Sequence, residues 1–165
     1  MVYILDAYNV IHKIRSLERA LEKDLRAARE ALIAACGRLA ARRGDISQII
    51  LVFDGNSKFW DIPHLCPPKI KLVFSETGED ADDRIVTVLE DLPAKAAPCV
   101  VSDDNSVRNH ARSHKTRVMP AAEFETLLDP DGTQGKKKAP SNTFSLSQKL
   151  ADEITAAYKK DLGIK

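Results

Sequence analysis

Five short apolar runs occur between residues 2 and 119, and each has the length of a β-strand. The run at 49–53 is almost wholly apolar, as expected for a strand covered by helices on both faces. The first run is followed by Asp-Ala-Tyr-Asn at 6–9, which we interpret as its exit turn. The predicted strands are 2–5, 49–53, 70–74, 99–101 and 117–119.

Between these runs, apolar residues recur at steps of three and four among charged residues, the spacing of a helix with one buried face. The pattern predicts one long helix over 17–43, ended by Gly44, and shorter helices over 81–92, 104–114 and 121–128. Strands that alternate with helices in this way predict an α/β fold of three layers with a mostly parallel, five-stranded sheet.

The composition changes after residue 128, which divides the chain into three predicted parts. Residues 1–128 form one α/β domain. Residues 129–144, rich in Asp, Gly, Pro and Lys, predict a flexible linker. Residues 145–165 predict a C-terminal helix, because Ser145 and Gln148 form a capping pattern ahead of an amphipathic stretch.

The net charge of +1 over 165 residues hides an uneven distribution. Residues 1–130 carry 18 basic and 20 acidic side chains, a net of −2, and residues 131–165 carry 7 and 4, a net of +3. An acidic domain favours a bound cation, and a basic tail favours a polyanionic partner.

Three widely spaced cysteines fit reduced thiols better than a disulfide framework or a metal knot. The chain has no signal-like leader and no apolar run near the roughly 20 residues that span a membrane. We therefore expect a cytoplasmic protein that does not interact with membranes. The sequence does not predict an oligomeric state.

Acidic residues stand where the predicted strands end or the next helix opens. They are Asp6, Asp54, Asp82 and Asp103. The carboxyl ends of parallel strands meet at one edge of a sheet, so these side chains are expected to converge. Clustered carboxylates repel each other unless a cation compensates them, and Mg²⁺ or Mn²⁺ prefers such oxygen ligands. An ion of this kind can activate water for hydrolysis of a phosphodiester.

A structural interpretation of these acids is equally well supported by spacing alone. Aspartate is a common helix cap after a strand, and Asp82 and Asp104 fit that role. The sequence motifs around the acids shift the balance between the two interpretations.

These motifs are five segments, in the order ILDAYNVI at 4–11, VFDG at 52–55, FS at 74–75, GEDADDRI at 78–85 and VSD at 101–103. Together they resemble the YacP-like NYN family, relatives of the PIN-domain nucleases. The resemblance extends from residue 2 to about 128, and 146–163 looks like the family's carboxy-terminal extension. Ala7 stands where the family usually has glycine, which costs backbone freedom in the exit turn but removes no ligand.

The resemblance implies a three-layer PIN-like fold with sheet order 3-2-1-4-5. It also implies a Mg²⁺- or Mn²⁺-dependent endoribonuclease that cleaves single-stranded RNA, with messenger RNA on the ribosome as a substrate of some members. Asp6 and Asp82 match the acids most closely tied to cleavage, and Asp54 and Asp103 match the supporting acids. Asp6, Asp82 and Asp103 are the implied metal ligands.

Three further residues are candidates for substrate contacts, each with an ordinary alternative. Asn9 can bind the scissile phosphate or a ligating carboxylate, and it equally fits a turn or cap. Ser102 can contact phosphate, although a strand-end serine usually bonds local backbone. Arg84 can reach a phosphate, although a surface ion pair is the commoner role.

Two other classes of function use the same features. A catalytically silent RNA- or ribosome-binding module would keep the fold and the basic tail without turnover. Phosphotransfer enzymes also place aspartate at strand ends, but they need an Asp-x-Asp pair or adjacent acids after the first strand. This chain has Asp6-Ala-Tyr there, so we rank phosphotransfer last.

Overall fold

The computed structural model describes residues 1–55, 66–76, 78, 80–93 and 95–130. Its elements are β1 (Val2–Asp6), α1 (Ala7–Lys13), α2 (Arg15–Leu21), α3 (Leu25–Arg42), β2 (Gln48–Phe53), β3 (Ile70–Phe74), α4 (Ala81–Glu90), β4 (Pro98–Val101), α5 (Asn105–Ser113), β5 (Arg117–Met119) and α6 (Ala121–Leu128). All five strands are parallel, in the order β3-β2-β1-β4-β5, which confirms the predicted α/β fold. The predicted C-terminal helix and all but two residues of the predicted linker lie outside the described residues.

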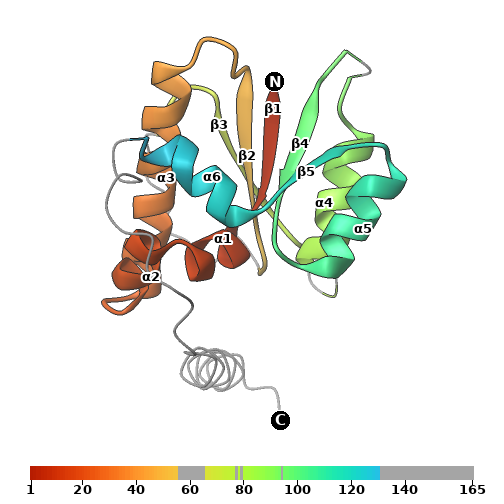
Figure 1. The fold of residues 1–165 in the computed structure, drawn as a ribbon. Helices are drawn as coiled ribbons and strands as arrows, with labels where there is room; N and C mark the ends of the chain where they lie inside the picture. Colours follow the sequence, from red (N-terminus) through yellow and green to blue (C-terminus); the bar gives the residue numbers. More distant parts are fainter. Residues whose placement is uncertain (56–65, 77, 79, 94, 131–165) are drawn as a thin grey trace, which may run out of the picture. The chain divides into compact units, whose positions relative to one another are not determined.

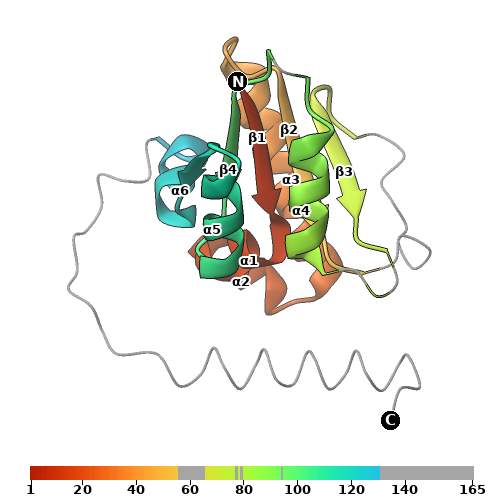
Figure 2. The same ribbon diagram turned by 90° about the vertical axis from the view of Figure 1, so that its right-hand side faces the viewer.

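Helices cover both faces of the sheet, with α1, α3 and α6 on one side and α4 and α5 on the other (Figures 1 and 2). Side chains alternate between the faces of a strand, and β1 shows the result. Tyr3 and Leu5 join the core beneath α1, α3 and α6, whereas Val2 and Ile4 join the core beneath α4 and α5. Every residue of β1 is buried, which explains why its sequence is almost continuously apolar.

The prediction of one helix over 17–43 is wrong, because α2 and α3 are separate helices. The chain between them turns at Asp24, whose extended backbone ends the helical path. The Asp24 carboxylate accepts a hydrogen bond of 2.6 Å from the Ala27 N–H and so caps α3. The residues that form this break have ordinary helix propensities, so the apolar spacing alone did not reveal it.

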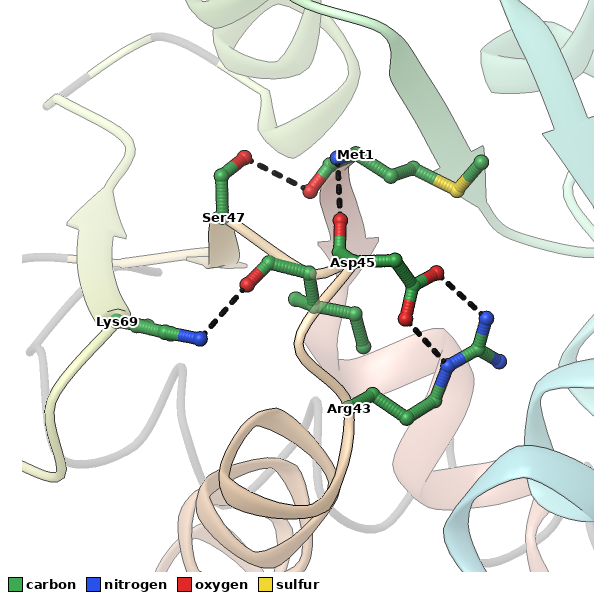
Figure 3. A network of polar contacts seen from close by, with 6 residues as sticks. Met1, Arg43, Asp45, Ser47 and Lys69 are labelled. Atoms are coloured by element: carbon green, nitrogen blue, oxygen red, sulfur yellow. Dashed lines mark hydrogen bonds and ion pairs between the residues drawn. The ribbon is translucent and has the colours of Figure 1, made fainter.

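The amino ends of the strands are joined by polar contacts (Figure 3). The amino group of Met1 donates to the Asp45 carbonyl at 2.7 Å, and the Ser47 hydroxyl donates to the Met1 carbonyl at 2.9 Å. Lys69, at the start of β3, donates through Nζ to the Ile46 carbonyl at 2.9 Å. These contacts occupy one end of the sheet, and the predicted acidic residues lie at the other.

No helix in the described part of the chain is long and apolar enough to cross a bilayer. Cys36, Cys66 and Cys99 are free thiols, and the first and last of them are buried.

Candidate active site

Asp6 is the last residue of β1, the central strand, and it is nearly buried at 9% exposure. Its Oδ1 accepts the backbone N–H of Asn9 at 3.3 Å, so this aspartate also caps α1. The helix therefore begins directly after the strand, and the exit turn predicted at 6–9 is wrong. Its Oδ2 accepts the hydroxyl of Ser102 at 3.2 Å. The two hydrogen bonds fix the carboxylate at the carboxyl edge of the sheet.

Asn9 and Ser102 connect this edge to the segment after β4. Asn9 Oδ1 accepts the Asp103 N–H at 3.0 Å, and Ser102 Oγ accepts the Asp104 N–H at 3.0 Å. Ser102 is completely buried between its two partners. The α1 and α5 connections leave β1 and β4 on opposite faces, so this is the switch point where α/β folds commonly bind ligands.

Asp82 and Asp104 approach Asp6 from the helices on the other face. Asp82 lies in the first turn of α4, where the Ser106 side chain acts to lower its pKa. Asp104 caps α5 by accepting the N–H groups of Ser106 at 2.7 Å and Val107 at 3.3 Å. Ser106 thus donates to the Asp104 carboxylate and also influences Asp82, at the beginnings of α5 and α4.

The surroundings of Asp6 and Asp82 disfavour the ionised form of both carboxylates. The pKa of Asp6 is raised from its usual value of 3.8 to about 6, chiefly by burial and to a smaller extent by the charges of Asp82 and Asp104, while the hydrogen bonds from Asn9 and Ser102 oppose the rise. Burial also raises the pKa of Asp82, and the charges of Asp104 and Asp80 add to the effect. A bound cation would relieve both penalties.

The donor chemistry at this edge suits a hard divalent ion. Carboxylate oxygens are the ligands that Mg²⁺ and Mn²⁺ prefer, and Mg²⁺ commonly binds through one or two carboxylates while it keeps several waters. Among the described residues, no group of three potential ligand side chains is close enough to form a complete cage. Asp6 and Asp82 therefore fit an open, partly hydrated site.

The other two predicted site residues, Asp54 and Arg84, lie at the end of β2 and on α4. Asp54 follows β2, and its Oδ1 accepts the hydroxyl of the buried Ser75 at 2.8 Å. The same serine oxygen accepts the N–H of Gly55 at 3.0 Å, which holds the end of β2 beside the end of β3. Arg84 lies two residues after Asp82 on α4, and its side chain is partly buried.

The sequence interpretation did not include Asp104 or Ser106 in the site. The structure confirms the helix cap predicted at Asp104, but the same charge also acts on Asp6 and Asp82. The available signal was the pair Asp103-Asp104 directly after a buried strand. Asp103 itself contacts Asn9 through its backbone N–H, so the pair contributes to this edge in two different ways.

Acidic side chains at the carboxyl edge of a parallel 3-2-1-4-5 sheet define an α/β protein of the PIN-like class. Residues 3–163 match the model of the YacP-like NYN domain, and the chain belongs to that family.

Two solved structures of Rae1 (YacP) from Bacillus subtilis have a similar fold. One has a TM-score of 0.63 over 97% of this chain and 93% of that chain. The other, a tryptophan-to-leucine mutant, has a TM-score of 0.64 over 81% and 77%. Both are 18% identical to this chain, so the likeness concerns the fold. No curated protein matches the sequence.

Proposed function

We propose that the protein is a metal-dependent endoribonuclease that hydrolyses phosphodiester bonds of single-stranded RNA, with Mg²⁺ or Mn²⁺ as cofactor. The observation that carries the proposal is the buried carboxylate of Asp6, with Asp82 and Asp104 near enough to raise its pKa. A site that concentrates unfavourable negative charge is suited to a divalent cation and, through it, to a phosphate. Membership of the NYN family supports the same activity.

Asp6 and Asp82 are the residues that would hold the ion, with Asp103 as the third ligand implied by the family resemblance. A bound ion would supply Lewis acidity and a more acidic water. The other side chains position these ligands. Ser102 is completely buried and donates to Asp6, which favours an orienting role over a phosphate contact. Asn9 uses its Oδ1 on the Asp103 N–H, so its NH₂ group is the part suited to a phosphate.

The roles of Asp54 and Arg84 follow from their positions. Asp54 supports the site from the end of β2, where Ser75 holds its carboxylate. Arg84 is proposed as a phosphate contact on α4. RNA and the ribosome as partners, and a cytoplasmic location, remain predictions from the sequence and the family resemblance.

The test is cleavage of an end-labelled single-stranded RNA in Mn²⁺ or Mg²⁺ by the unmodified protein and by Asp6→Asn and Asp82→Asn. We expect the unmodified protein to cut internally, EDTA to abolish cutting, and each variant to lose at least about 100-fold in rate, because each loses a ligand of the ion.

Asp83→Asn is the matched control, since Asp83 neighbours Asp82 on α4 but is exposed. It should retain activity within a factor of about three, the range expected when no catalytic contact is removed. Equal cleavage by all four proteins would refute the assignment of the site.

A second candidate function is a catalytically silent RNA-binding module, which the sequence leaves as the alternative to a nuclease. That function predicts RNA binding without cleavage in either metal. It also predicts that Asp6→Asn leaves RNA affinity unchanged or increases it, because removal of a negative charge weakens repulsion of phosphate.

A further inference from the structure

The segment from α5 to the start of α6 is strongly basic, although the whole chain is nearly balanced at 25 basic and 24 acidic residues. Residues 105–122 contain four arginines and lysines, two histidines and no acidic residue. The neighbouring helix α4, by contrast, has acidic residues in its first turn and no basic residue in its last turn. The excess of positive charge is therefore a local property of this segment.

Polar side chains of this segment form a single stripe along α5. Asn105, Arg108, Asn109 and Arg112 recur at steps of three and four, so they lie on one face of the helix. The opposite face holds the buried Val107 and Ala111, which pack on the sheet. The stripe is solvent-facing, since its two asparagines and Arg112 are exposed and Arg108 is partly buried.

Lys115 adds a cation just beyond the end of α5. We define the basic stripe as Asn105, Arg108, Asn109, Arg112 and Lys115. Lys115 follows the end of α5, is exposed, and has a left-handed backbone with a φ of 56°. That conformation turns the chain into β5 and places a lysine where the helix ends.

The cations of the basic stripe are not neutralised by carboxylates of the described residues. The nearby Arg117 differs, because it forms an ion pair with Glu123 at 3.6 Å. Arg112 donates to the side-chain oxygen of Asn109 at 3.4 Å, a neutral partner within the stripe. The Nε–H of Arg108 is buried and lacks an acceptor within the described ranges. The stripe thus keeps positive charge and donor groups for a partner.

The basic stripe starts at the candidate active site and leads away from it. Asp104, whose charge acts on Asp6 and Asp82, is the cap of α5, and Asn105 is the first residue of the helix. Because β4 is parallel to β1, α5 begins at the carboxyl edge and returns toward the amino edge (Figure 2). Its nine residues extend for about 14 Å.

We propose that the basic stripe binds the phosphates of a single-stranded RNA and guides that strand to the acidic centre. Arginine presents a planar fork of donors that matches phosphate geometry, and the interleaved asparagines add neutral donors for sugars or phosphates. Without a bound ion the acidic carboxylates repel a polyanion, so the attraction of RNA to the metal-free protein has to come from residues beside the centre. The identity of the polyanion rests on the proposed nuclease function.

The test measures binding of a fluorescein-labelled single-stranded RNA to the full chain by anisotropy, in EDTA, over a series of salt concentrations. The variant is Arg112→Gln with Lys115→Gln, two exposed positions. Loss of two phosphate contacts should lower the slope of log affinity against log salt by about 1.4, at about 0.7 per contact. Affinity at low salt should fall by at least about tenfold, since the lost counterion release favours binding most strongly there.

The matched control is Arg19→Gln with Arg38→Gln, which removes the same charge from exposed positions on α2 and α3. It should leave the salt slope unchanged. Equal losses in both double variants would show a general charge effect and overturn the proposal, as would no loss in either. Arg108→Gln, checked for folding by circular dichroism, should add to the loss in the stripe variant.

The same assay separates RNA from an acidic protein partner and from the nuclease proposal. Poly-glutamate at equal charge should compete poorly with RNA, and competition as strong as that of unlabelled RNA would overturn the assignment. Binding in EDTA does not require turnover. A protein that binds RNA through the stripe but cuts nothing would therefore contradict the proposed function and leave this inference intact.

Discussion

Asp6 combines a structural role with an electrostatic penalty. As a strand-end residue it caps α1 and accepts the Ser102 hydroxyl, and both hydrogen bonds favour its ionised form. Burial nevertheless dominates and raises the pKa of Asp6 to about 6. A neutral, hydrogen-bonding residue could cap α1 without the cost of burying a charge. Folding stability therefore does not explain why a charged residue stands at position 6.

The penalty predicts that Asp6→Asn stabilises the metal-free protein at neutral pH. A raised pKa means that the folded state binds the proton more tightly, so stability falls as pH rises from about 4 to 6 and stays low above that. Burial of the ionised Asp6 carboxylate costs up to ~3 kcal/mol of folding stability at pH 7.5. Asparagine cannot make both hydrogen bonds equally well, so Asp6→Asn should raise the free energy of unfolding by only ~1–2 kcal/mol.

Urea unfolding in EDTA at pH 7.5 and pH 4.0 measures this difference. At the lower pH Asp6 is protonated in the folded state, so the gain should disappear. A variant that is destabilised equally at both pH values would contradict a charge penalty at this position.

Ala7 stands where the family usually has glycine, and the structure shows what this replacement costs. The family's usual glycine would give freedom to a turn, but here residue 7 is the first residue of α1 and is completely buried. Among the described residues other than glycine, only Lys69 and Lys115 have a positive φ. Alanine is a good helix former, so the departure from the family pattern costs little at this position.

At the scale of elements, the sequence predicted strands better than helix boundaries. The predicted ranges of β3 and β5 agree with the structure, because a short apolar run between polar residues has few alternative registers. The division between α2 and α3 was missed, since the apolar spacing continues across it and the Asp24 cap is a local hydrogen bond. Periodicity reports the buried face of a helix and not its continuity.

The candidate site was predictable only in part for a related reason. The convergence of Asp6 and Asp82 follows from parallel strands and the family resemblance, and the coupling between their charges is consistent with it. The contribution of Asp104 depends on how far the start of α5 lies from the start of α4. That distance is set by helix packing on the sheet, which a single sequence does not specify.

Helix α3 contains a contact that restricts one of its residues to glycine. A Cβ on Gly37 would lie 2.8 Å from Cγ and 2.9 Å from Cβ of Pro67, which are closer than carbon atoms pack. Gly37→Ala should therefore lower the free energy of unfolding by about 1–3 kcal/mol from overpacking, even though alanine favours a helix by about 1 kcal/mol.

Gly44→Ala is the control, because nothing lies within 4 Å of a Cβ at that position. It should change stability by no more than about 0.5 kcal/mol. Thermal or urea unfolding of both variants gives the comparison, and a stabilising Gly37→Ala would show that the segment at Pro67 moves away at little cost.

At the scale of the whole molecule, an ion bound at the carboxyl edge would couple ligand binding to folding stability. An ion that binds the folded protein alone stabilises it by mass action, by about 2.7 kcal/mol at 100 times its dissociation constant. We therefore expect Mn²⁺ to raise the melting temperature in a concentration-dependent manner. Asp6→Asn and Asp82→Asn should lose this response, and Asp83→Asn should retain it.

Differential scanning fluorimetry with a Mn²⁺ series measures the response without any RNA. A rise of equal size in all variants would place the ion elsewhere on the protein. No rise in the unmodified protein would favour the silent binding module over the nuclease.

The central strand β1 pairs with β2 on one side and with β4 on the other, and β4 starts at residue 98. During synthesis from the amino terminus, one edge of β1 therefore stays unpaired until β4 is made, almost a hundred residues later. Neither Ser102 nor Asp104 is present until then, so a shorter nascent chain carries Asp6 without its companions. The candidate active site can be completed only after most of the domain has been synthesised, so the proposed activity would begin only when the fold is nearly complete.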